Sequence, residues 1–145
     1  MKILFIISWV GIMMLNSTTS RAAEVSINVT NIDVKRGGSI IVMIFGENGF
    51  PIQHEKAFFI LTDNSLQESM KFTFNLNMEE MAVKVLHDEN EDGKVTKNWM
   101  GIYPREGLGF SNDQAISVTG APGYKKSKLS RDQFKDGLNI SIKYP

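Results

Sequence analysis

The stretch MAVKVLH, residues 81–87, decides the class of fold that this chain can adopt. Side chains alternate between the two faces of a β-strand, so every second residue of the stretch shares a face. One face carries Met81, Val83, Val85 and His87, and the other carries Ala82, Lys84, Leu86 and Asp88. His87 continues an apolar row. We therefore expect its ring at the end of the core, with one ring N–H donated to a backbone carbonyl that pins the following loop.

The period of two recurs along the rest of the chain. Apolar and polar residues alternate in three further segments, 25–30, 72–76 and 138–144. The run SIIVMIF, residues 39–45, is continuously apolar and suits a central strand that is covered on both faces. Residues 115–119 make a weaker strand, and residues 57–61 fit either a short strand or one helical turn.

These segments predict an all-β chain without a long amphipathic helix. Six or seven short strands separated by turn signals are typical of an antiparallel β-sandwich. We expect a single sandwich of about seven strands with one long ordered loop, residues 87–112.

The first 22 residues have the pattern of a secretory signal peptide. Lys2 supplies the positive start, residues 3–15 are apolar but short for a membrane span, and Ala22 ends a small-residue cleavage pattern. The mature chain would then be one β-sandwich domain, residues 23–145, without a transmembrane anchor. We expect it to be periplasmic or secreted, and its lack of cysteine means that it needs no disulfides.

Charge excludes one class of partner. Removal of residues 1–22 takes away Lys2 and Arg21, so the mature chain has 14 basic and 16 acidic residues, and 14 − 16 = −2. This balance is not that of a nucleic-acid-binding protein.

An acidic sequence, D-x-N-x-D-G, begins at the end of the 81–87 strand. Asp88, Asn90 and Asp92 place oxygen ligands at alternate positions before Gly93, and the backbone carbonyl of Lys94 falls at position seven. This spacing resembles the first half of a calcium-binding loop.

The second half of the sequence lacks the matching ligands. Trp99 stands where a calcium loop has a bidentate Glu. Other oxygen ligands would have to fold back to complete the shell, and the candidates are Glu106, Asn98, Asn112 and Asp113. Such a site would bind calcium weakly, and no other cofactor is required. A series of Asx turns, in which Asp and Asn side chains bond their own backbone, explains the acidic residues equally well.

The remainder of the loop contains residues suited to a tight, ordered structure. We expect glycines with positive φ, anchoring aromatic rings and hydrogen-bonding side chains to organise it. The residues with these roles are His87, Gly93, Asn98, Gly101, Tyr103, Pro104, Gly107, Gly109, Phe110 and Asn112.

The loop also carries a specific resemblance. Its HDEN-x-D-GK run, followed by N-x-x-G-I-x-P-x-EG-x-GFSN, and the earlier VMIFGENGFP segment closely resemble the bacterial family called domain of unknown function 2141. The resemblance implies a small exported protein with an immunoglobulin-like or transthyretin-like sandwich, and it implies no established activity. Thr96 stands where the family pattern commonly has an aspartate, which weakens the calcium interpretation.

Two functions from different classes follow from these residues. The first is an exported binding or accessory module whose functional surface is the 87–112 loop, with an envelope protein or glycan as partner. The second is a cell-envelope glycan hydrolase that uses Asp88 or Asp92 with Glu106 as its carboxylate pair. The chain has no Cys and no serine in a nucleophile-elbow context, so we assign no catalytic residue and prefer the binding module.

Overall fold

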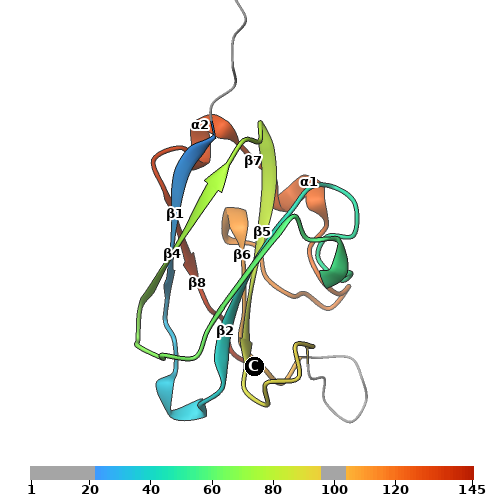
Figure 1. The fold of residues 1–145 in the computed structure, drawn as a ribbon. Coiled ribbons are helices and arrows are strands. Elements are labelled where there is room, and N and C mark those ends of the chain that lie inside the picture. Colours follow the sequence, from blue (N-terminus) through green and yellow to red (C-terminus); the bar gives the residue numbers. More distant parts are fainter. Residues whose placement is uncertain (1–21, 96–103) are drawn as a thin grey trace, which may run out of the picture.

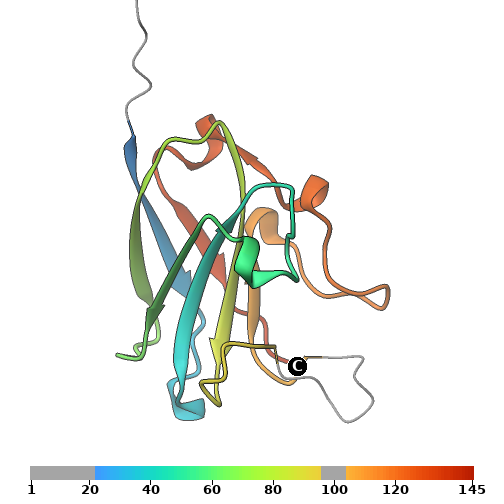
Figure 2. The same ribbon diagram turned by 45° about the vertical axis from the view of Figure 1, so that its right-hand side comes forward.

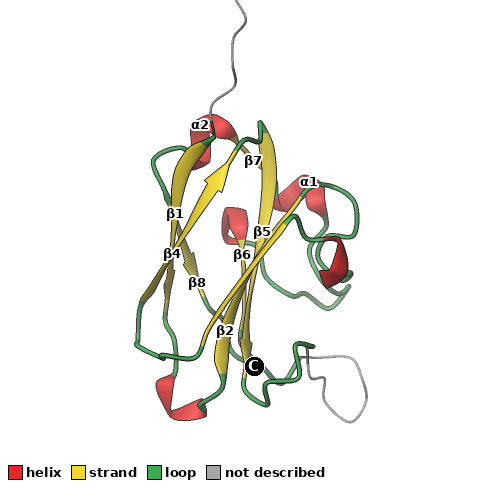
Figure 3. Ribbon diagram, viewed as in Figure 1, coloured by secondary structure: helices red, strands yellow, loops and turns green. Residues whose placement is uncertain are grey.

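The computed structural model describes residues 22–95 and 104–145, and these residues form two packed β-sheets (Figures 1 and 3). The smaller sheet has the order β4-β1-β8. The larger sheet has the order β3-β2-β5-β6, and the short strand β7 pairs with β5. The strands are β1 (Ala23–Thr30), β2 (Ser39–Phe45), β3 (Phe59–Asp63), β4 (Met70–Leu76), β5 (Glu80–Asp88), β6 (Leu108–Phe110), β7 (Leu129–Ser130) and β8 (Leu138–Ser141).

Short helices occupy the connections between strands. Three are 3-10 turns, η1 (Val34–Arg36), η2 (His54–Lys56) and η3 (Ser111–Asp113). Two are single α-helical turns, α1 (Tyr124–Ser127) and α2 (Arg131–Phe134). No helix in the described ranges 22–95 and 104–145 is both long enough and apolar enough to cross a membrane.

The all-β prediction is confirmed, and the main strands lie where the alternation placed them. Of the ambiguous 57–61 segment, residues 59–61 belong to a strand, β3, which pairs with β2. Residues 115–119 do not form the expected strand. They lead into a tight turn closed by a bridge between Ser117 and Gly120, and no strand in the described part of the chain pairs with them.

The chain differs from the expected antiparallel arrangement at one pair of strands. β8 runs parallel to β1, with Ile27 opposite Leu138 and Val29 opposite Ile140. The other strand pairs among the described residues are antiparallel. The period of two is the same in both arrangements, so alternation alone does not give the strand direction.

Apolar residues form two separate clusters, one on each face of the larger sheet. The cluster between the sheets takes side chains from both, including Ile27 of β1, Val42 of β2 and Val83 of β5. The second cluster lies on the outer face of the larger sheet and includes Met43 and Leu86. Every residue of β2 is buried, which confirms that the 39–45 run is a central strand covered on both faces.

The outer cluster is covered by connections rather than by a third sheet. Figure 2 brings forward the connection that contains η2, beside the orange connection that follows β6. Phe50 and Ala57 of the first connection and Ile116 of the second pack against this cluster. These two connections and the outer face of β5 and β6 surround the largest cavity described below.

Candidate functional site

A pocket of about 1010 Å³ lies on the outer face of the larger sheet. Its apolar walls include Phe50 and Ile52 from the connection after β2, Leu108 and Phe110 from β6, and Ile116. Gly93, Lys94 and Val95, together with Pro104, bring parts of the 87–112 loop to the same pocket. Pockets of this size with mostly apolar walls and few polar groups are typical of small-molecule sites.

Lys84 supplies the buried polar group of this pocket. It lies in the middle of β5, on the face shared with Ala82 and Leu86, and is only 4 % exposed. Its Nζ donates to the carbonyl oxygen of Pro51 at 2.9 Å and lies 2.7 Å from Nε2 of His54. Burial lowers the pKa of Lys84 from 10.5 to about 8, because the charged amine loses its water.

His54 connects Lys84 to the acidic loop. Its Nδ1 lies 3.2 Å from the carbonyl oxygen of Gly93, and a carbonyl can only accept. Nδ1 is therefore the donor, and Nε2 is the nitrogen that accepts from the Lys84 ammonium. Burial, followed by the charge of Lys84, lowers the pKa of His54, in agreement with a neutral ring.

The charge of Lys84 has no carboxylate beside it in the described part of the chain. The ion pairs found there involve other cations, and both acceptors of Lys84 are neutral. A buried cation without an anion is costly unless it is hydrogen-bonded or receives an anionic partner. Lys84 therefore has the chemistry of an anchor for an anionic group.

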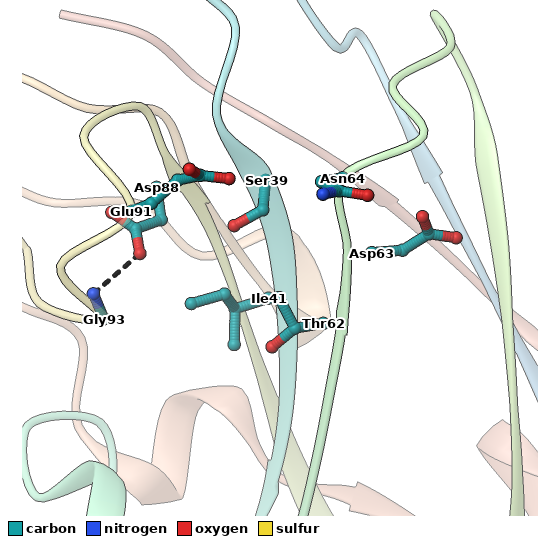
Figure 4. Close-up of a pocket in the computed structure, with 8 residues that line it drawn as sticks. All are labelled: Ser39, Ile41, Thr62, Asp63, Asn64, Asp88, Glu91 and Gly93. Carbon is teal, nitrogen blue, oxygen red and sulfur yellow. Dashed lines mark hydrogen bonds between the residues drawn. The ribbon is translucent and has the colours of Figure 1, made fainter.

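Asp88, the first residue of the acidic sequence, is buried and binds the backbone of its own loop. Its carboxylate accepts from the backbone N–H of Gly93 at 2.7 Å (Figure 4). It also accepts from the backbone N–H of Asp92 at 3.2 Å. Asn90 Oδ1 also accepts from the N–H of Asp92, and Asp92 Oδ1 accepts from that of Lys94. These are the contacts of an Asx-turn series.

A smaller polar pocket of about 460 Å³ lies against the same turn. In Figure 4, Asp88 and Glu91 lie on one side of Ser39, and Asp63 and Asn64 lie on the other. Within residues 22–95 and 104–145, no three His, Asp or Glu side chains are grouped so that they could hold a metal ion.

Glu106 does fold back to the start of the acidic sequence, as the calcium interpretation requires. It is 3 % exposed, and its Oε1 accepts from the backbone N–H of Glu89 at 3.1 Å. Asp88 and Glu106 thus both serve as acceptors for backbone groups. Asp92, the third carboxylate considered for hydrolysis, is exposed.

His87 is fully buried at the end of the core. Its Nε2 donates to the carbonyl of Gly37 at 2.7 Å, so its Nδ1 accepts from the Tyr144 hydroxyl at 2.7 Å. The ring thus bonds a backbone carbonyl as expected, but that carbonyl lies between β1 and β2 and not in the 87–112 loop. The backbone of His87 makes the link to the loop, because its N–H donates to Gly107 at 2.9 Å.

The glycines of this loop have two different roles. Gly93 has the expected positive φ, +72°. Gly107 and Gly109 do not, and the positive-φ expectation is wrong for them. They are required by close packing: a Cβ on Gly107 would lie 2.4 Å from the ring of Tyr144, and one on Gly109 would lie 2.7 Å from Ile140.

The other loop-organising residues are distributed as follows. Phe110 is buried in β6, with its ring 6.3 Å from that of Phe50. The Asn112 side chain donates to the carbonyl of Lys126, and Pro104 lines the large pocket. Asn98, Gly101 and Tyr103 lie outside the described residues. The expected loop is also shorter than 87–112, because residues 108–110 pair with β5 as β6.

Sequence reasoning missed Lys84 and His54 as partners. One signal was present: Lys84 sits between Ala82 and Leu86 on one face of a strand, where a lysine has no polar neighbour. The role of His54 had no comparable signal, because its contact with Lys84 joins positions 30 residues apart.

Comparison with known proteins gives a family and nothing closer. No curated protein and no solved structure matches the chain. A family model described as "Uncharacterized protein conserved in bacteria (DUF2141)" matches residues 27–136, a range that contains Lys84, His54 and the whole lining of the large pocket. The chain therefore belongs to this bacterial family, DUF2141.

Proposed function

We propose that this protein is an exported bacterial binding module that holds a small ligand with an apolar body in the pocket beside Lys84. The observation that carries the proposal is the pocket itself, in which an apolar wall surrounds two convergent polar side chains, Lys84 and His54. The 87–112 loop contributes one wall through Gly93, Lys94 and Val95. A ligand bound in this pocket would therefore lie next to the loop that the sequence singles out.

Binding is preferred to glycan hydrolysis because of how the carboxylates are used. A glycosidase needs two carboxyl groups that face a shared substrate. Asp88 and Glu106 instead accept hydrogen bonds from backbone N–H groups of the turn. These contacts support a role in shaping the wall of the pocket.

Three further parts of the proposal rest on the sequence. Export to the periplasm or the medium rests on the signal-peptide pattern of residues 1–22, and an immunoglobulin-like or transthyretin-like sandwich rests on the family resemblance. A weak calcium site at Asp88, Asn90 and Asp92 rests on their spacing. An unchanged melting temperature in 10 mM calcium would remove that site from the proposal.

The binding proposal is tested with Nile red, a neutral apolar dye whose emission rises in an apolar environment. We expect saturable binding with one dye per chain. Ala121 lines the pocket but is exposed, so Ala121→Trp can occupy pocket volume without disturbing the core and should weaken dye binding.

Val118→Trp is the matched control, because Val118 lies in the same connection, is 87 % exposed and does not line the pocket. It should bind the dye as the unmodified protein does. Absence of saturable binding, or equal loss in both variants, would overturn the proposed function.

A further inference from the structure

The geometry points to Lys84 as the anchor for a ligand that carries one carboxylate on an apolar body. This inference rests on the proposed binding function and names the chemical class of its ligand. It follows from the hydrogen bonds of Lys84, the missing counter-charge and the composition of the pocket wall.

Among the described residues, the contacts of the Lys84 ammonium leave one donor for a ligand. An ammonium has three N–H donors, and the described residues accept two of them, at the Pro51 carbonyl and at His54 Nε2. Because Lys84 lines the pocket, the third donor is available to an acceptor bound there. His54 cannot take the place of Lys84 as donor, because its N–H is directed to Gly93.

A carboxylate fits this position better than a neutral acceptor. At pH 7 a lysine whose pKa is about 8 is protonated by about ten to one, so the buried charge is present. A carboxylate would supply the missing counter-charge, and charge-assisted hydrogen bonds are stronger than neutral ones. A hydroxyl or a carbonyl would accept the hydrogen bond but leave the charge uncompensated.

The remaining wall selects an apolar body. Phe50, Leu108, Phe110 and Ile116 surround the cavity. Apart from His54, whose ring is neutral, the other ionisable side chains in its lining are Glu55 and Lys94, which are exposed and of opposite sign. Lys84 is thus the buried charge of the pocket.

The test compares decanoate with decan-1-ol, which share the same alkyl chain. Displacement of Nile red should show that the unmodified protein binds decanoate more tightly by about tenfold or more, as expected for a charged hydrogen bond in a buried site. Lys84→Met should lose this preference and bind the two compounds alike. Lys84→Gln, whose amide can still donate to Pro51, is measured beside it in case the Met variant folds poorly.

Lys71→Met provides the control, because Lys71 is an exposed lysine of β4 on the other sheet and its loss changes the net charge equally. It should keep the preference for decanoate. Equal binding of decanoate and decan-1-ol by the unmodified protein would overturn the anchor role while the binding function stands, and so would loss of the preference in Lys71→Met. Absence of saturable binding by Nile red and both compounds would instead remove the proposed function itself.

Discussion

At position 84 the chain places an amine in a strand whose neighbouring residues on the same face are apolar. Lysine is almost never fully buried unless it is paired. Here its partners are a carbonyl and a neutral imidazole, and they belong to a connection that packs on the sheet. The residue therefore holds the 51–54 segment against β5 and also presents a charge to the pocket.

Burial of Lys84 makes the free energy of unfolding depend on pH in the alkaline range. Its pKa is about 8 in the folded protein and 10.5 ordinarily, so the unfolded chain binds more protons between these values. The free energy of unfolding therefore rises with pH across this window, by at most about 3 kcal/mol from this one group. Lys84→Met lacks this contribution.

The measurement is urea denaturation of both proteins at pH 7 and pH 10. Relative to Lys84→Met, the unmodified protein should gain stability at the higher pH, because other groups titrate alike in both. Parallel stabilities at the two pH values would show that Lys84 is solvated and that its burial carries no cost.

Among the elements, β6 is formed by close packing against neighbouring segments and not by a pattern in its own sequence. It has three residues, and it pairs with β5 on one side while Leu108 bridges Lys143 on the other. Gly107, just before β6, leaves room for the ring of Tyr144, which in turn bonds His87. The end of the loop, the C-terminal segment and the core histidine thus form one packed group.

This packing makes Gly107→Ala destabilising. The added Cβ would lie 2.4 Å from the Tyr144 ring and 2.5 Å from Ile142, so one of these side chains must move. We expect a loss of about 1–3 kcal/mol in the free energy of unfolding, as is usual for overpacking. Thermal and urea denaturation measure it.

Gly123→Ala is the comparison, because a Cβ there meets no atom within 4 Å and its φ of −78° suits any residue. It should unfold like the unmodified protein. Equal behaviour of the two alanine variants would contradict the packing described for β6.

At the scale of the molecule, the C-terminal segment joins the two sheets. β8 pairs with β1 in the smaller sheet, and Lys143 then bridges Leu108 of the larger sheet. Ile140 and Ile142 are buried in the core between the sheets, and Tyr144 packs against it. The segment closes one side of the structure.

Truncation after Gly137 should therefore unfold the protein. Loss of Ile140 and Ile142 from the core costs on the order of 2–5 kcal/mol each, against a total stability of about 5–15 kcal/mol. We expect no cooperative melting transition by circular dichroism. A truncated protein with an unchanged melting temperature would show that β8 is peripheral.

Alternation and continuous apolar runs were sufficient to predict the strands at 25–30, 39–45, 72–76 and 81–87, because burial imposes a period on each strand separately. The same alternation marked His87 as buried, whereas the spacing of the D-x-N-x-D-G residues fitted both a calcium loop and a series of Asx turns. These are properties of neighbours in sequence, which a pattern can record.

Only the tertiary structure decided the rest. The parallel pairing of β8, the strand at 108–110 and the need for Gly107 depend on segments that meet from distant positions. The Lys84–His54 contact and its pocket are of the same kind, because they require that the connection after β2 pack on the outer face of β5. Periodicity specifies which face of a strand is buried, whereas the side chains that meet on that face are chosen by packing between elements.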